Sequence, residues 1–125
     1  MTDITAVGEI LIDLTQCGTN ELGIPLFAAN PGGAPANLAV AAARLGAKAA
    51  FIGKVGTDGF GTLLKNTLEE NHVDISGLVT DDRNRTTLAV VALDKTGERS
   101  FSFYRDPSAD VNLRAEEISP EQLKH

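Results

Sequence analysis

Residues 30–61, NPGGAPANLAVAAARLGAKAAFIGKVGTDGFG, carry most of the information about the fold. The paired Gly32 and Gly33 precede an alanine-rich run from Pro35 to Leu45. This run predicts a helix, because alanine has the highest helix propensity and proline is tolerated in the first helical turn. Gly46 follows the run and predicts the end of the helix, where a left-handed residue is common. The paired glycines predict that something approaches the backbone closely ahead of this helix.

Further elements are predicted on both sides of this helix. The apolar run Lys48–Val55 predicts a buried strand, and Gly56–Gly61 predicts a turn. A second helix is predicted over Phe60–Glu70, with one apolar stripe made of Phe60, Leu63, Leu64 and Leu68. Upstream, Ile4–Leu14 predicts a strand buried on both faces, and Gly18–Asn30 predicts a loop with a short strand. This alternation of strands and helices predicts an α/β fold with a parallel sheet.

The pattern changes in the last third of the chain. Arg85–Leu93 and Glu98–Arg105 flank the turn sequence DKTG, which predicts a β-hairpin. On the second arm, strand alternation places Phe101, Phe103 and Arg105 on one face. A hairpin beside a parallel sheet indicates an accessory flap. A further helix is predicted to begin at Pro120.

The composition excludes several classes of function. The chain has 125 residues, a formal net charge of -6 and no basic run, which argues against nucleic acid and anionic membranes as partners. No apolar run is long enough to span a membrane, and no signal peptide is predicted. Cys17 is the single cysteine, which fits a reducing compartment. We therefore expect a soluble, cytoplasmic protein, and we expect no metal site because no His/Cys cluster is present.

The common phosphate-binding and hydrolase motifs are absent. A P-loop requires Ser or Thr after its Gly-Lys pair, but Gly53 and Lys54 are followed by Val55. The dinucleotide fingerprint is also missing, since the glycines after Val55 have the wrong spacing. A Ser-His-Asp hydrolase would need a nucleophile elbow, and the sequence has none.

The remaining polar residues predict a site for a sugar or another polyol. We predict Asp13 at the end of the first strand, where open α/β sheets bind their ligands. A carboxylate, free N–H groups, an amide and a guanidinium can together satisfy several hydroxyls, and an aromatic ring suits the face of a sugar. The predicted ligand residues are Asp13, Gly32, Gly33, Asn37, Phe103 and Arg105.

Each of these residues also has a simpler interpretation. Asp13 could cap a turn, and Asn37 could be a solvent-facing helical residue. The glycine pair could be an ordinary loop, and Arg105 could be a charge at the rim of the protein.

Taken together, these residues resemble the PfkB, or ribokinase-like, family of carbohydrate kinases. The N-terminal signature of that family is matched by the pair GG, the asparagine four residues later, and the turn VGTDGFG at 55–61. GEILIDL at 8–14 resembles the family's first strand, and GERSFSFYRDPSAD at 97–110 resembles its fructokinase branch. The resemblance extends from Val7 to about Ile118.

The resemblance implies an activity and a fold. Members transfer the γ-phosphoryl group of ATP, with Mg²⁺, to a sugar hydroxyl, and fructokinases produce fructose 6-phosphate. The implied fold is an α/β three-layer sandwich with a small β-sheet lid, here about residues 15–31 and 85–106. Asp13 would bind sugar hydroxyls, Gly32, Gly33 and Asn37 would line the floor, and Phe103 and Arg105 would come from the lid. The lid would also form a homodimer contact.

One part of the family pattern is missing. The second signature, Gly-Ala-Gly-Asp, contains the catalytic aspartate, and nothing in this sequence matches it. Residues 1–125 are therefore expected to be the N-terminal portion of one kinase domain, without a catalytic residue and inactive alone. Three alternatives stay open: an inactive sugar-binding or dimerisation module, a kinase for ribose, 2-keto-3-deoxygluconate or a nucleoside, and an unrelated Rossmann-like binding domain.

Overall fold

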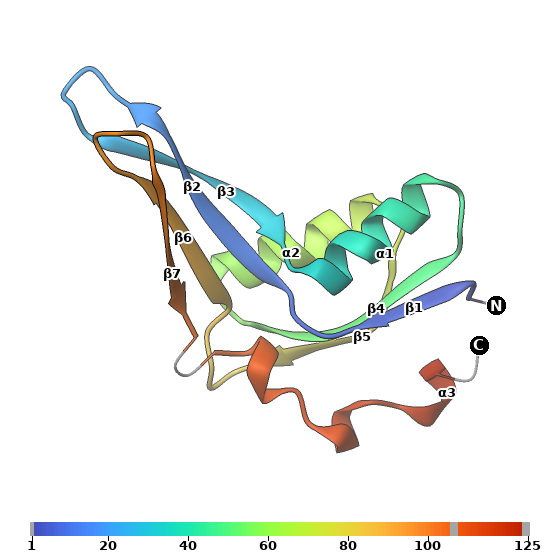
Figure 1. The fold of residues 1–125 in the computed structure, drawn as a ribbon. Coiled ribbons are helices and arrows are strands. Elements are labelled where there is room, and N and C mark those ends of the chain that lie inside the picture. Colours follow the sequence, from blue (N-terminus) through green and yellow to red (C-terminus); the bar gives the residue numbers. More distant parts are fainter. Residues whose placement is uncertain (1, 106–107, 124–125) are drawn as a thin grey trace.

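Two β-sheets separate the molecule into a helix-covered body and a projecting arm (Figure 1). This computed structural model describes residues 2–105 and 108–123. The body contains a parallel three-stranded sheet of order β1-β4-β5, formed by β1 (Ile4–Val7), β4 (Ala49–Gly56) and β5 (Asp74–Asp81). The mixed α/β class predicted from the sequence is confirmed.

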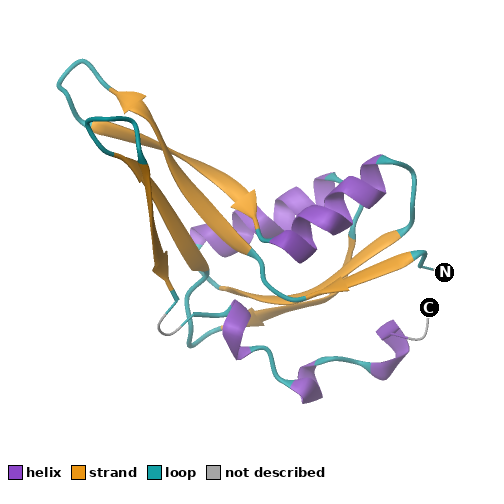
Figure 2. Ribbon diagram, in the orientation of Figure 1, coloured by secondary structure: helices purple, strands orange, loops and turns teal. Residues whose placement is uncertain are grey.

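Helices α1 (Ala34–Arg44) and α2 (Gly59–Glu70) lie together over one face of the three-stranded sheet (Figure 2). Both predicted helices are therefore confirmed. The α2 stripe is only partly correct, because Leu64 and Leu68 are buried whereas Leu63 is 36% exposed. Leu63 lies just outside the arc of the helix that contacts the sheet. The core between the helices and the sheets is made of buried apolar side chains, the largest of which include Ile10, Ile12, Phe51, Leu64 and Leu68.

The projecting arm is a four-stranded sheet of order β3-β2-β6-β7. Its strands are β3 (Pro25–Gly32), β2 (Leu11–Thr19), β6 (Thr87–Leu93) and β7 (Arg99–Tyr104). Strands β2 and β6 run parallel, whereas β2–β3 and β6–β7 are antiparallel pairs. The predicted hairpin is thus confirmed, and it continues a sheet that begins with β2 and β3. All six residues of β7 are exposed.

One predicted element is wrong and another is only partly right. Ile4–Leu14 is not one strand, because the chain leaves the three-stranded sheet after Val7 and enters the four-stranded sheet at Leu11. Gly8 lies at this break with φ 147°, and a Cβ atom there would lie 2.8 Å from the Pro35 side chain. In the segment 18–30, the short strand predicted around residues 26–29 is confirmed as part of β3, but the loop before it is shorter than predicted, since β2 continues to Thr19 and β3 begins at Pro25. Polar residues are acceptable in both strands because the sheet is mostly exposed at this end.

The C-terminal segment crosses the opposite face of the three-stranded sheet (Figure 1). It contains the short 3₁₀ helices η1 (Asp110–Asn112) and η2 (Ala115–Glu117) and the helix α3 (Pro120–Leu123), which begins at the predicted proline. Lys54 of β4 holds this segment in place, because its Nζ donates to Glu117 at 2.8 and 3.0 Å and to the Asn112 carbonyl at 3.2 Å. Among the described helices, none is long and apolar enough to cross a membrane.

Candidate functional site

A single row of residues crosses the four-stranded sheet and includes two of the predicted ligands. Asp13 on β2 is paired with Asn30 on β3 and with Ala89 on β6, and Ala89 is paired with Phe103 on β7. Directly paired residues point to the same face of a sheet. Asp13 and Phe103 therefore share one face, two strand spacings or about 10 Å apart, with only the small Ala89 between them.

Asp13 was predicted at the end of the first strand, but it lies at the start of β2. The correction follows from the break after Val7, which makes Asp13 the third residue of a new strand in the second sheet. Its carboxylate lies directly against Gly32, where Oδ2 occupies the place that a Cβ atom would take. A larger residue at this position would displace the carboxylate from where it lies, and Asp13 and Gly32 are brought together as predicted.

Gly33 forms the N-cap of α1 and connects the sheet to the helix. It has φ 102°, and a Cβ atom there would lie 2.7 Å from the carbonyl oxygen of Glu9. The backbone N–H of Ala34 donates to Glu9 Oε1 at 3.5 Å. The N-terminus of α1 is thus packed against residues 9–10, and a carboxylate lies beside its positive end.

Arg105 follows β7 and joins the hairpin to this region. Its Nη2 lies 3.1 Å from Glu9 Oε2 and 3.4 Å from Asp110 Oδ2. Its guanidinium carbon lies 5.2 Å from the centre of the Phe103 ring, which is within the range of a cation–π interaction. The predicted shared face of Phe103 and Arg105 is therefore confirmed by direct contact.

Asn37 is brought close to the two predicted glycines, since its backbone N–H donates to the Gly33 carbonyl at 2.9 Å. It is exposed in the first turns of α1 and lines a small pocket together with Gly32 and Thr67. Neither Asp13 nor Arg105 lines that pocket. A role for Asn37 in binding the same ligand as Asp13 stays a prediction.

The electrostatics of the site are dominated by carboxylates. Burial raises the pKa of Asp13, and the negative charge of Glu9 raises it further. The charge of Glu9 therefore opposes the ionisation of Asp13. A ligand that donates hydrogen bonds to both would relieve this repulsion, as the hydroxyls of a sugar do.

Two acidic residues of this site were not among the predicted ligands. Glu9 lies within the run Ile4–Leu14 that was predicted as one buried strand, and an acidic residue in such a run is itself a signal. Asp110 lies at the end of the RDPSAD motif, and its side chain is completely buried. Asn30, paired with Asp13, is a third polar residue on the same face.

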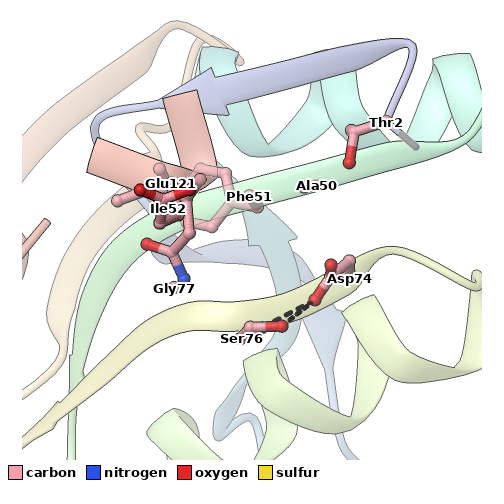
Figure 3. A pocket seen from close by; sticks show the side chains of 9 residues that line it. Thr2, Ala50, Phe51, Ile52, Asp74, Ser76, Gly77 and Glu121 are labelled. Carbon is pink, nitrogen blue, oxygen red and sulfur yellow. Dashed lines mark hydrogen bonds between the residues drawn. The ribbon is translucent and has the colours of Figure 1, made fainter. Parts of the chain in front are cut away.

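A pocket on the far side of the body contains none of these residues. It measures ≈ 190 Å³ and lies where α3 meets β4 and β5 (Figure 3). Asp74 and Ser76 are hydrogen-bonded at its edge. Its lining residues are Thr2, Ala50, Phe51, Ile52, Asp74, Ser76, Gly77, Glu121 and Gln122.

Comparison with known proteins identifies the family of the chain. The family model described as the pfkB family carbohydrate kinase matches residues 1–125. The chain belongs to this family. Fructokinase-1 of Zea mays is 49% identical over 123 residues, which are 97% of this chain and 38% of that protein.

Solved structures give the same assignment for the fold. A fructokinase from Xylella fastidiosa superposes with a TM-score of 0.89 at 44% identity, covering 94% of this chain and 37% of that one. A Vibrio cholerae fructokinase, solved with fructose, ADP and calcium ion bound, gives a TM-score of 0.79 at 42% identity, covering 93% and 36%. The ribokinase-like fold is thereby confirmed. The chain spans little more than a third of the length of each of these relatives.

Proposed function

We propose that the polypeptide containing this chain is an ATP-dependent sugar kinase that phosphorylates fructose to fructose 6-phosphate. The observation that carries the proposal is the row linking Asp13 to Phe103, with Arg105 beside it, in a chain of the carbohydrate kinase family. The choice of fructose is supported by its fructokinase relatives. Residues 1–125 would form the N-terminal portion of one kinase domain.

The predicted residues would have distinct roles in this function. Asp13 would accept hydrogen bonds from sugar hydroxyls, and Gly32 and Gly33 would let the sugar approach the backbone, with Asn37 on the same floor. Phe103 would pack beside the sugar, and Arg105 would donate to its oxygens. The four-stranded sheet, which includes most of residues 15–31 and 85–106, would act as the lid.

We assign ATP and its divalent metal to no residue of this chain. The described residues contain no group of three or more His, Cys, Asp or Glu side chains that could hold a metal ion, and the sequence contains no P-loop. ATP and Mg²⁺ are proposed as substrate and cofactor of the whole enzyme, since the V. cholerae fructokinase was solved with ADP and calcium ion. When bound, they would supply the phosphoryl group and neutralise its charge.

The activity is tested by coupling ADP release to a spectrophotometric signal in the full-length polypeptide. Fructose, ribose, 2-keto-3-deoxygluconate and a nucleoside would be compared as acceptors. We expect turnover with fructose, and a loss of about 100-fold or more in kcat/KM for fructose in Asp13→Ala, because a buried donor–acceptor set would lose its acceptor. Turnover with another acceptor alone would overturn fructose as the substrate, and no turnover with any of them would overturn the activity.

We also propose a homodimer formed through the four-stranded sheet in a cytoplasmic protein. One face of this arm exposes large apolar side chains, among them Leu93, Phe101 and Phe103, and a second copy of the same sheet would cover them. Cys17 is free and exposed, which suits a reducing compartment. Sedimentation equilibrium at micromolar concentration tests the dimer, and a monomer under those conditions would contradict it.

A further inference from the structure

Asp110 is the fixed partner of the arginine that approaches the sugar. Its side chain is completely buried, whereas the Arg105 side chain is 31% exposed and that of Glu9 is 43% exposed. An ion pair between exposed groups is screened by water and holds geometry weakly. Of the two carboxylates among the described residues that contact Arg105, Asp110 is therefore the one placed to fix the orientation of the guanidinium.

The surroundings of Asp110 hold its carboxylate in one position. Oδ1 accepts a hydrogen bond from the hydroxyl of Thr87 and a longer one of 3.4 Å from Ser108. Thr87 is 0% exposed and belongs to β6 of the four-stranded sheet. With Oδ1 fixed in this way, Oδ2 is left to face Nη2 of Arg105.

The backbone around Asp110 is also anchored to the body of the protein. Asp110 begins η1, and the last residue of η1, Asn112, receives a hydrogen bond from Lys54 on its carbonyl at 3.2 Å. The backbone N–H of Ala109 donates to the Arg85 carbonyl at 2.7 Å. The short helix η1 is thus held by both sheets: Asp110 accepts from Thr87 of β6, and Asn112 accepts from Lys54 of β4.

We propose that Asp110 is a positioning residue for sugar binding: it holds the Arg105 guanidinium over Phe103 in the orientation that receives the sugar. This inference rests on the proposed function. Without the Asp110 charge, the ion pairs of Arg105 among the described residues would be reduced to the one with the exposed Glu9, and the guanidinium would be freer to turn toward solvent. The main consequence is weaker binding of the sugar, because Arg105 would have to be ordered each time the sugar binds.

A double-mutant cycle between Asp110 and Arg105 tests the proposal in the full-length polypeptide. Asp110→Asn keeps the size of the side chain and an acceptor for Thr87, but removes the charge that faces Arg105. We expect the KM for sugar to rise about tenfold, as for loss of a charge-assisted hydrogen bond, with the KM for ATP unchanged. In an Arg105→Met background, the same substitution is expected to leave the KM for sugar unchanged.

Glu116→Gln is the matched control. Glu116 lies in the same segment and faces Arg114 at 3.7 Å, but the two side chains are 70% and 69% exposed. We expect no change in the KM for sugar. Calorimetric titration with fructose in the absence of ATP provides a readout that does not depend on catalysis, and it is expected to follow the same pattern.

The outcomes separate the proposal from the activity on which it rests. If Asp110→Asn raises the KM for sugar equally in both backgrounds, or by less than about twofold in the first, the positioning role is overturned while the kinase activity stands. If the unsubstituted polypeptide phosphorylates no sugar, both the proposed kinase activity and the positioning role of Asp110 are overturned. Should Asp110→Asn fail to fold, the cycle is repeated with Thr87→Val, which removes the hydroxyl that holds Oδ1, and a rise in KM of about threefold that vanishes with Arg105→Met is expected.

Discussion

Strands β4 and β7 show how differently the two sheets are built. Seven of the eight residues of β4 are buried, whereas all six residues of β7 are exposed. Each strand has phenylalanine, but Phe51 of β4 is 0% exposed and Phe103 of β7 is 57% exposed. The comparison shows that β4 is built into the core of the body, while β7 presents large side chains to solvent.

The pair of phenylalanines gives the largest expected contrast in stability. Phe51→Ala should lower the free energy of unfolding by about 4 kcal/mol, because it leaves a cavity in the core. Phe103→Ala should change it by about 0.5 kcal/mol or less and should instead raise the KM for sugar. Urea unfolding of each variant, followed by circular dichroism, measures the difference. Similar losses of stability in the two variants would show that β7 is as much a part of the core as β4.

A buried ion pair gives the next contrast. Lys54 and Asp81 each have side chains only 6% exposed and lie 3.7 Å apart, and Lys54 also contacts Glu117 at 2.8 Å. Lys54→Met should lower the free energy of unfolding by about 3 kcal/mol, because it leaves buried carboxylates without a cation. Arg114 lies in the same C-terminal segment as Glu117, and its side chain is 69% exposed. Arg114→Met should therefore lower the free energy of unfolding by about 0.5 kcal/mol or less.

The same cluster predicts a dependence of stability on pH. Hydrogen bonds from Lys54 lower the pKa of Glu117. Burial opposes the ionisation of Asp81, but hydrogen bonds from Asn84 and the backbone N–H of Arg83, with the charge of Lys54, lower its pKa. Since both values lie below those of the unfolded chain, about 4, the stabilisation is complete above that pH and is lost as pH falls through the folded values. Acid titration should show a smaller decline in Lys54→Met, and equal declines would contradict the role of Lys54.

Local patterns were enough to predict the body of the molecule. The helix α1 was marked by its alanines and by Gly46, which indeed has φ 97°, and β4 was marked by a continuous apolar run. These signals are contained within a few residues, so they do not depend on the rest of the chain.

The arrangement of the arm depends on contacts between distant residues. The pairing of β2 with β6 joins residues such as Asp13 and Ala89, and no local pattern specifies it. Asp13 lies in the second sheet because the chain changes direction at Gly8. The nearly continuous apolar run Ile4–Leu14 gave no sign of this break. Glu9 and Arg105 are 96 positions apart in sequence. Each charge can be read from the sequence, but no local pattern indicates that the two side chains meet.

The junction between the two regions is tested by its glycines. Gly33→Ala should lower the free energy of unfolding by about 2 kcal/mol, because φ is 102° there and the new Cβ would lie 2.7 Å from the Glu9 carbonyl. Gly59 begins α2 with open space around it, so Gly59→Ala should be neutral or raise stability by about 0.5 kcal/mol. Thermal unfolding of the two variants measures this, and a stable Gly33→Ala protein would contradict the close packing of α1 on residues 9–10.

The smallest expected change in stability is for a substitution of Asp13. The direction of this change distinguishes a residue kept for ligand binding from one kept for folding. Because burial and Glu9 raise its pKa, Asp13 keeps its proton more readily in the folded protein than in the unfolded chain. Its contribution to stability is therefore fully present below the unfolded pKa of about 4 and is lost as pH rises through the folded value. Asp13→Asn cannot ionise, so at pH 7 it should be slightly more stable than the unsubstituted protein, with no such gain at pH 3.

Sugar binding should change in the opposite direction in the same variant. An amide removes the charged acceptor, so calorimetry should detect much weaker binding of fructose by Asp13→Asn even though its melting temperature rises. A residue that lowers stability when ionised, but is required in that form for the ligand, is under selection for binding and not for folding. A variant that loses stability at pH 7 and keeps its affinity for fructose would instead make Asp13 a structural residue of β2, and the contrast between the two sheets would no longer describe their roles.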